Sequence, residues 1–188
     1  MDGYKREISV PYNLSTEDLS VIRAIQGTNP KFCTPALEYT ENCQRCVTAY
    51  EARRRGYDVT ASPYLVGQND LLPYMTNPLG WPAAYKNHRL ESCAASTGEQ
   101  ARQRVESLMK LYGNHGRAII KVDWLMRNKG HLFMAENRDD MVFFIDPQTG
   151  SLDVAWYFSY VNPHTVVIMR TDQTEFTKLA EQCFERST

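Results

Sequence analysis

The sequence has 188 residues, of which 21 are Lys or Arg and 22 are Asp or Glu, and 43% are hydrophobic. These values are typical of a globular chain that can bury a core, and they exclude a mostly disordered protein. The formal net charge of −1 excludes the uniform positive field of proteins that bind nucleic acid or membrane surfaces.

No segment of the sequence predicts a membrane anchor or a secretory signal. No apolar run approaches the roughly 20 residues that a spanning helix needs, and the first residues lack a hydrophobic signal segment. We therefore expect one domain over residues 1–188, with neither a nucleic-acid nor a membrane partner. Export of the protein would need a carrier other than a leader of its own.

The first forty residues predict an N-terminal extension with one short helix. A Ser-Thr-Glu-Asp run at 15–18 is a capping signal, apolar residues follow at helical spacing, and Gly27 ends the pattern. Asn-Pro and Thr-Pro pairs then indicate irregular chain. The core of the domain is expected over 41–188.

A helix is predicted from Cys43 to about Arg55, with Asn42 as its N-cap and Gly56 as its stop. Its apolar face carries Cys43, Cys46, Val47 and Tyr50. Glu51 and the arginines that follow it are expected on the opposite side, as a solvated helix end.

Residues 62–95 are rich in Pro, Gly, Asn and Tyr and predict a long loop region with room for one short helix. We expect this region to face a substrate or a partner, since binding residues concentrate on loops. A second helix is predicted from Gln100 to Leu111, opened by the Ser-Thr pair at 96–97 and ended by Gly113.

The hydrophobic period then changes from helical to strand-like. Strands are predicted over 117–124, 131–136 and 141–146, with further candidates over 151–158 and 165–170, and an amphipathic helix over 174–185 closes the chain. This order predicts an α+β domain, in which an N-terminal helix packs on an antiparallel sheet.

A candidate nucleophile lies at the start of the helix predicted from Cys43 to about Arg55. Cys43 occupies the first turn, where unpaired backbone N–H groups and the helix dipole stabilise a thiolate and can receive an oxyanion. Cys46 lies one turn further in, where these effects fade, so physical chemistry favours it as a packing residue. The other three cysteines, at 33, 93 and 183, are expected to be buried or half-buried.

A base and a carboxylate follow on two neighbouring strands. If the turn is centred between Arg138 and Asp139, His131 and Asp146 face each other directly across the antiparallel pair. Such a carboxylate fixes the imidazole tautomer and leaves the other ring nitrogen for Cys43. A register shift of one residue would put the two side chains on opposite faces.

Two alternatives compete for the Cys-x-x-Cys pair. A zinc site needs two further ligands, and no second Cys-x-x-Cys or spaced His pair supplies them. A thioredoxin-like redox pair would follow a βαβ pattern, which is absent here. We therefore expect neither a metal nor a cofactor.

Three blocks of the sequence together resemble the papain-fold toxin family of type 1, the glutamine-deamidase type. The first is Asn-Cys-Gln-Arg-Cys-Val at 42–47, continued by Ala-Tyr-Glu at 49–51 and Arg-Gly-Tyr-Asp-Val at 55–59. The second comprises Gly-His at 130–131 and Phe-Ile-Asp-Pro-Gln at 144–148, and the third is Arg-Thr-Asp at 170–172 with the final segment. The similarity extends over about residues 29–185.

The resemblance implies a papain-like cysteine enzyme with the chain order Cys, His, Asp. Position by position, it makes Cys43 the nucleophile, His131 the general base and acid, and Asp146 the orienting carboxylate. Asn42 and Gln148 would support the substrate or the oxyanion. In papain itself the second cysteine of a Cys-x-x-Cys pair is catalytic, so Cys46 stays open as the alternative nucleophile.

The resemblance also implies a toxin module of a larger protein that is secreted or injected and acts in the cytoplasm of a target cell. Its expected activity is deamidation of a glutamine on a target protein, and a cognate immunity protein is a further expected partner. Three alternatives remain open at this point: a cysteine protease, a transamidase with the same three residues, and an inactive papain-like binding module.

Overall fold

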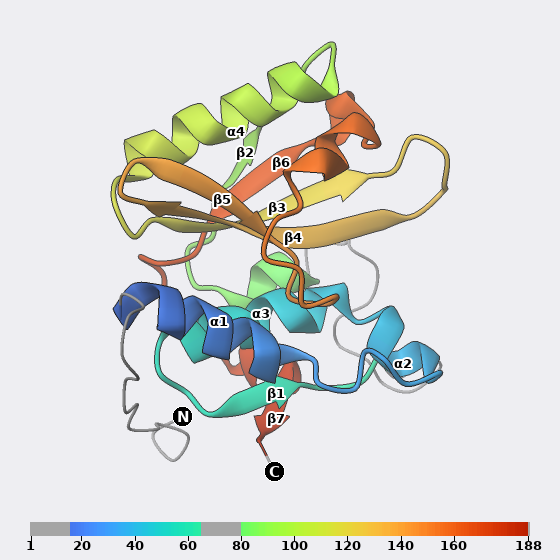
Figure 1. Cartoon of the computed structure of the whole chain (residues 1–188), viewed down its shortest axis with the longest axis vertical. Helices are drawn as coiled ribbons and strands as arrows, with labels where there is room; N and C mark the ends of the chain where they lie inside the picture. The colour runs from blue at the N-terminus through green and yellow to red at the C-terminus, as the bar shows by residue number, and fades with distance from the viewer. Residues whose placement is uncertain (1–15, 65–79, 188) are drawn as a thin grey trace.

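Figure 1 shows the computed structural model, which describes residues 16–64 and 80–187. A five-stranded antiparallel sheet runs through this part of the molecule in the order β2-β6-β3-β4-β5. Its strands are β2 (Leu90–Ser92), β3 (Arg117–Asp123), β4 (Gly130–Arg138), β5 (Met141–Ile145) and β6 (Val167–Arg170). Helices cover both faces of the sheet, and the predicted α+β class is confirmed.

Helix α4 (Gly98–Tyr112) lies on one face of the sheet and α3 (Cys43–Arg54) on the other (Figure 1). Successive side chains of β3 and β4 point to opposite faces, so each strand contributes to two cores. Ile119 and Met134 belong to the core on the α3 side, whereas Ile120 and Phe133 belong to the core on the α4 side. Burial on both faces explains why these strands are apolar almost throughout.

Helix α3 is enclosed on most sides, and nine of its twelve residues are buried. Besides the sheet, it packs against α1 (Thr16–Thr28), the 3-10 helix η2 (Trp81–Ala84) and a small sheet of β1 (Val59–Ala61) and β7 (Phe184–Arg186) (Figure 1). Its bounds agree with the prediction. The helix begins directly after Asn42 and ends before Gly56, whose φ of +90° favours glycine.

The charged end of α3 is not the solvated surface that the sequence indicated. Glu51 is fully buried and pairs with Arg55 at 2.8 Å and with Arg117 at 2.9 Å. Arg54 is also largely buried and pairs at 2.8 Å with Glu136. The prediction was wrong because Arg117 and Glu136 come from β3 and β4, far beyond the range of a local charge pattern.

The ends of α4 follow the predicted signals. The hydroxyl of Thr97 accepts a hydrogen bond from the backbone N–H of Gln100 at 3.2 Å, and Gly113 stops the helix with a φ of +84°. At the first position, Gly98 packs on the backbone carbonyl of Phe158 so closely that no side chain would fit. This contact fixes the segment around Phe158 against the start of α4.

Two segments, 151–158 and 174–185, differ from their predicted structure. Residues 151–158 do not form a strand but lead into the 3-10 helix η3 (Ala155–Ser159), in which the adjacent Tyr157 and Phe158 are both buried. Two consecutive buried side chains do not fit the alternation of a strand on one face. The strand predicted over 165–170 is present as β6, which begins two residues later because the 3-10 helix η4 (Pro163–Thr165) precedes it. The closing helix predicted over 174–185 is replaced by η5 (Lys178–Gln182) and β7.

The N-terminal helix is close to its expected form, and the long loop predicted over 62–95 is described only in part. Helix α1 extends one residue beyond Gly27, and a short α2 (Leu37–Thr40) precedes α3. The region 62–95 contains η2 as its short helix and β2 as an additional strand, while residues 1–15 and 65–79 lie outside the described residues. Within 16–64 and 80–187, each helix is too short or too polar to span a bilayer.

Candidate active site

Cys43 is the first residue of α3, and the residue before it does not cap the helix with its side chain. The Asn42 amide instead donates to the backbone oxygen of Ser62 at 3.2 Å, and its side-chain oxygen accepts from the amide of Asn29 at 3.4 Å. Asn42 is the N-cap residue, as predicted, but its side chain makes no capping hydrogen bond because long-range partners hold this buried amide. The first backbone N–H groups of α3 lie beside Cys43 without a capping side chain.

His131 and Asp146 form a buried hydrogen-bonded pair. The Nε2 atom of His131 lies 3.0 Å from Oδ2 of Asp146, whose side chain is fully buried. The same carboxylate accepts three further hydrogen bonds, from the hydroxyl of Tyr157 to Oδ2 at 2.7 Å and from the backbone N–H groups of Gln148 and Thr149 to Oδ1 at 2.9 and 3.4 Å. Both carboxylate oxygens are thus fixed, and Nδ1 is the remaining ring nitrogen of His131.

The pairing of β4 with β5 differs from the predicted register by two residues. The turn is centred between Asp139 and Asp140, whose φ angles of +50° and +62° are those of a two-residue type I′ hairpin loop. Arg138 therefore pairs with Met141, and His131 does not face Asp146 directly. A shift of two residues preserves the face on which a side chain lies, so the two side chains still meet, diagonally and beyond the end of the ladder.

His131 also contacts the cysteine at the start of α3. Burial by itself would lower the pKa of the imidazole, but hydrogen bonds to Asp146 and to Cys43 outweigh it and raise this pKa to about 10. Burial likewise acts to raise the pKa of Asp146, and the hydrogen bond from His131 outweighs it and holds that pKa below its usual range. The arrangement favours an imidazolium between an anionic carboxylate and Cys43.

Cys46 lies one helical turn behind Cys43 and has a different environment. Its side chain is completely buried, and its thiol donates to the side-chain oxygen of Asn42 at 3.2 Å. Burial raises the pKa of the Cys46 thiol well above its usual value. Cys46 is thus held as a protonated thiol, whereas Cys43 contacts His131.

Gln148 connects the carboxylate with the N-terminal segment. Its backbone N–H donates to Asp146, its carbonyl oxygen accepts from Asn29 at 2.9 Å, and its side-chain amide donates to the backbone oxygen of Thr40. Its buried Oε1 has no hydrogen-bond partner among the described residues. Asn29 therefore contacts both Asn42 and Gln148, and it links the segments that carry Cys43 and Asp146.

Aromatic side chains that the sequence did not single out surround the imidazole. Trp124 stacks on His131 with ring centroids 5.7 Å apart, and Tyr157 meets it edge-on at 5.9 Å. Trp124 is the residue after the end of β3, and the pairing of β3 with β4 brings it next to His131. Tyr157 gave no signal because its segment was predicted as a strand.

The remaining cysteines lie outside this group. Cys93 and Cys183 are buried as expected, but Cys33 is exposed, because it lies in the irregular chain before α2 instead of under a packed element. None of the five cysteines forms a disulfide. Among the described residues, no three His, Cys, Asp or Glu side chains converge as a metal site would require.

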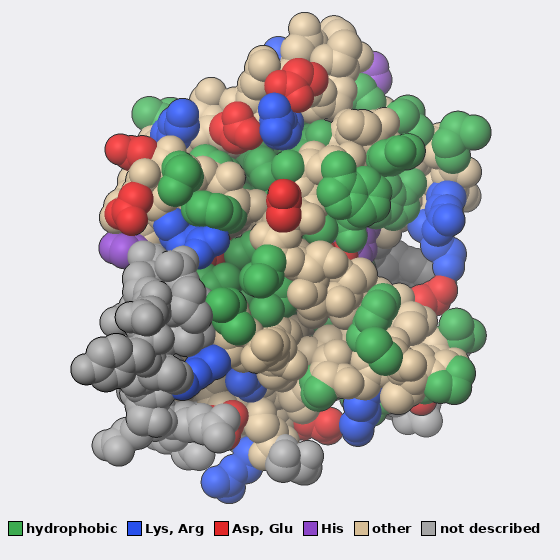
Figure 2. Space-filling model, in the orientation of Figure 1, with side chains coloured by type: hydrophobic (Ala, Val, Ile, Leu, Met, Phe, Trp, Pro, Cys, Tyr) green, Lys and Arg blue, Asp and Glu red, His purple; other side chains and the backbone are tan. Residues whose placement is uncertain are grey.

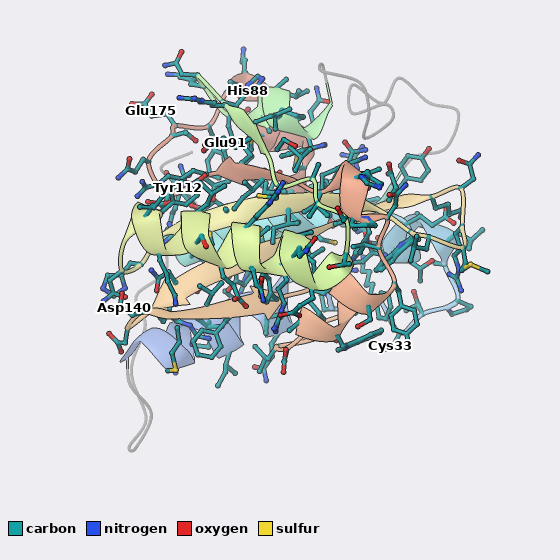
Figure 3. The ribbon with its side chains drawn as sticks, turned by 90° about the horizontal axis from the view of Figure 1, so that it is seen from above. Cys33, His88, Glu91, Tyr112, Asp140 and Glu175 are labelled. Carbon is teal, nitrogen blue, oxygen red and sulfur yellow. The ribbon has the colours of Figure 1, made fainter. Side chains whose placement is uncertain are left out.

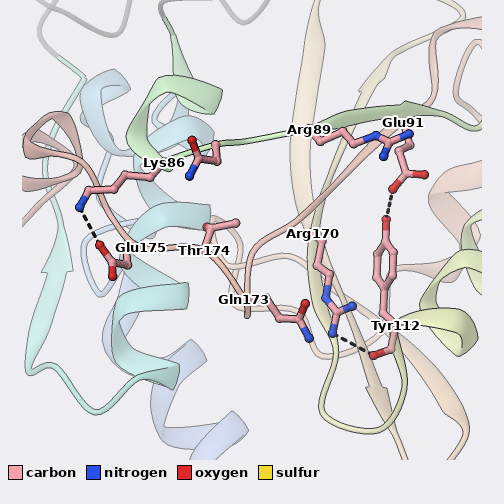
Figure 4. Close-up of a pocket in the computed structure, with 9 residues that line it drawn as sticks. Lys86, Arg89, Glu91, Tyr112, Arg170, Gln173, Thr174 and Glu175 are labelled. Atoms are coloured by element: carbon pink, nitrogen blue, oxygen red, sulfur yellow. Dashed lines mark hydrogen bonds and ion pairs between the residues drawn. The ribbon is translucent and has the colours of Figure 1, made fainter.

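A separate cavity of about 520 Å³ lies at the opposite edge of the molecule from Cys33, near His88, Glu91, Tyr112 and Glu175 (Figure 3). Most of the charged groups that line it are paired. Lys86 contacts Glu175 at 2.6 Å, and Tyr112 donates to Glu91 at 2.7 Å (Figure 4). It shares no residue with the group around Cys43.

Comparison with known families gives one match. The model of the family described as papain fold toxin 1, glutamine deamidase, matches residues 41–151, which is more than half of the chain. The match begins just before Cys43 and includes His131, Asp146 and Gln148. Searches of the curated proteins and of the solved structures returned no significant match.

Proposed function

The chain belongs to the papain fold toxin 1 family of glutamine deamidases, and we propose that it deamidates a glutamine side chain of a target protein through a thioester on Cys43. The observation that carries the proposal is the hydrogen-bonded series from Cys43 through His131 to Asp146. This is the order in which a nucleophile, a general base and acid, and an orienting carboxylate act in acyl transfer.

In the first step, the thiolate of Cys43 attacks the carboxamide carbon of the glutamine. The C–N bond then breaks, and the protonated His131 gives its proton to the leaving ammonia, so that an acyl thioester remains on Cys43. In the second step, His131 removes a proton from water, which attacks the thioester. A glutamate is released and the Cys43 thiolate is restored. The sum is glutamine plus water to glutamate plus ammonium.

Backbone N–H groups at the start of α3 would stabilise the oxyanion of both tetrahedral intermediates. No side chain of the N-cap residue competes for these groups, and the positive end of the helix dipole points at the same place. Asn42 and Gln148 support the site from behind, since both contact Asn29, which links the segments of Cys43 and Asp146. We assign both as positioning residues.

The toxin context is part of the proposal. The enzyme would reach the cytoplasm of a target cell as a module of a larger secreted or injected protein, and a cognate immunity protein would bind it in the producing cell. Deamidation replaces a neutral amide of the target by a carboxylate. One added negative charge at an interface or at a catalytic glutamine is sufficient to disable it.

The test measures ammonia release from N-protected Gln-Gly and the intact mass of a treated glutamine-containing protein. Deamidation adds about 1 Da without cleavage, whereas a protease would shorten the chain and a transamidase would add the mass of an amine. Cys43→Ala should abolish the reaction, and the matched variant Cys46→Ala should retain it. Full activity in Cys43→Ala, or its loss in Cys46→Ala alone, would overturn the assignment.

A further inference from the structure

Two segments that are distant in the sequence place large apolar side chains together on the surface beside the candidate active site. Trp156 and Tyr160 come from η3 and its end, and Leu125 and Met126 come from the loop between β3 and β4. Their exposed fractions are 60%, 59%, 56% and 92%, respectively. Figure 2 shows hydrophobic side chains gathered over these two elements. We call these four residues the apolar ledge.

The backbone holds the two halves of the ledge together. Trp124 and Val161 form an antiparallel bridge, and the N–H of Leu125 donates to the carbonyl oxygen of Tyr160 at 2.9 Å. The ring of Trp156 lies edge-on to that of Tyr160 with centroids 5.8 Å apart. The two segments are therefore held side by side, and their exposed apolar side chains lie on adjacent parts of the surface.

The ledge is continuous with the candidate catalytic residues. The ring of Trp156 packs on that of Tyr157 at 4.6 Å, and Tyr157 binds Asp146. At the other end of the β3–β4 loop, Lys129 pairs at 2.7 Å with Glu41, two residues before Cys43. The loop is thus tied to both sides of the site, and a chain segment that presents a side chain to Cys43 would lie across the ledge.

The residues of the ledge indicate the chemistry of the segment that would cover it. A contiguous group of large exposed apolar side chains marks an interaction surface, and aromatic residues contribute most of the binding energy at such surfaces. Arg127 lies at the tip of the same loop, is exposed, and has no acidic partner among the described residues. The surface combines apolar area with one unpaired positive charge.

From this continuity and charge, we propose that the ledge binds the target protein through apolar side chains next to the reactive glutamine and an acidic residue beyond them. This inference rests on the proposed function and specifies its substrate, which is a glutamine in an apolar, acidic-ended segment instead of free glutamine or any exposed glutamine. Trp156 and Met126 act as specificity-determining residues, and Arg127 adds charge complementarity.

Three synthetic peptides of equal length test the proposal. The first has Gln at its centre, Leu and Phe on both sides and Glu at the ends, the second replaces Leu and Phe by Ser, and the third replaces Glu by Lys. We expect kcat/KM for ammonia release to fall at least tenfold from the first peptide to the second and about threefold to the third, mainly through KM.

Ledge variants identify the surface responsible. Trp156→Ala and Met126→Glu should each remove most of the preference for the first peptide over the second, and Arg127→Glu should reverse the preference for Glu over Lys. Met126→Glu should not disturb folding, since the side chain of Met126 is almost fully exposed. The matched control is Leu111→Ala, an equally exposed apolar residue at the far end of α4, which should keep the preference.

Binding to the Cys43→Ala enzyme, measured by fluorescence anisotropy with the labelled peptides, separates the two proposals. If the wild type releases ammonia from no peptide but the Cys43→Ala variant binds the first peptide at least tenfold more tightly than the second, the deamidase assignment fails and the ledge proposal is supported. If all peptides react equally, or the ledge variants keep the preference, the ledge proposal is overturned. A Trp156-dependent dimer in sedimentation would also overturn it, because a second copy would then occupy the surface.

Discussion

The hydroxyl of Tyr157 donates a hydrogen bond of 2.7 Å to Oδ2 of Asp146, the same oxygen that contacts Nε2 of His131 at 3.0 Å. One carboxylate oxygen therefore holds two donors, while the other accepts the backbone N–H of Gln148. A buried carboxylate with this many donors stays anionic, and the anion in turn keeps the imidazole protonated and oriented. Tyr157 thus acts on Cys43 through two other side chains.

Loss of this hydroxyl should change the pH profile as well as the rate. In Tyr157→Phe, Asp146 loses one of its donors, so its pKa should rise; the more basic carboxylate holds the imidazolium proton more tightly, and the pKa of His131 should rise as well. We expect kcat/KM on N-protected Gln-Gly to fall roughly tenfold, which corresponds to one hydrogen bond to a charged group. The alkaline limb of the profile should also move to higher pH.

The chain contains a matched control for this variant. Tyr112 donates a hydrogen bond of the same length to the carboxylate of Glu91, on the other side of the molecule. Tyr112→Phe should leave both the rate and the pH profile unchanged. An unchanged profile in Tyr157→Phe would mean that Tyr157 has only a structural role.

The raised pKa of His131 also makes a prediction about stability. Its folded-state pKa of about 10 lies above the ordinary value of 6.5, so the pair with Asp146 stabilises the fold fully below pH 6.5 and loses this contribution as the pH rises through about 10. The midpoint temperature of thermal unfolding should be about 4 °C higher for the wild type than for His131→Gln at pH 6, and the difference should be smaller at pH 10. A difference that is constant over this range would contradict the pairing.

The sequence predicted those parts of the fold that depend on local signals. The ends of α3 and α4 follow from Asn42, Gly56 and Gly113, and the three central strands follow from apolar runs. It missed β1, β2 and β7, since three residues are too few to show an alternation and their partners lie far along the chain. The strand predicted over 151–158 was wrong because packing against α4, a contact between segments distant in the sequence, decides the conformation of these residues.

For the candidate site, local patterns were sufficient to name the three residues that lie together, but not their surroundings. Cys43 was marked by its place in a helix, and His131 and Asp146 by their places at strand ends. The register came out two residues off because the Asp139–Asp140 pair, and not the Arg138–Asp139 pair, takes the positive φ angles of the turn. Trp124 and Tyr157 reach the imidazole through tertiary contacts, which no spacing in the sequence records.

Reactivity of the thiols distinguishes an activated cysteine from an accessible one. Cys33 is exposed, whereas Cys43 is buried but contacts the imidazolium of His131. Iodoacetamide at pH 6 should therefore modify Cys43 at least tenfold faster than Cys33, as measured by peptide mass mapping, because a neighbouring imidazolium activates a cysteine as a nucleophile. His131→Ala should abolish this preference, and faster modification of Cys33 in the wild type would contradict an activated Cys43.

Glu51 is the charged residue on which the enclosure of α3 depends most. It is fully buried and compensates Arg55 and Arg117, with a further hydrogen bond from Thr171. Its removal in Glu51→Ala would leave two largely buried guanidinium groups without their counter-charge, which costs about 3–5 kcal/mol. We expect the free energy of unfolding measured in urea to fall by this amount. The control Glu99→Ala, which removes an exposed ion pair on α4, should lower it by less than about 1 kcal/mol. Equal losses in the two variants would mean that the buried pairs contribute no more than surface ones.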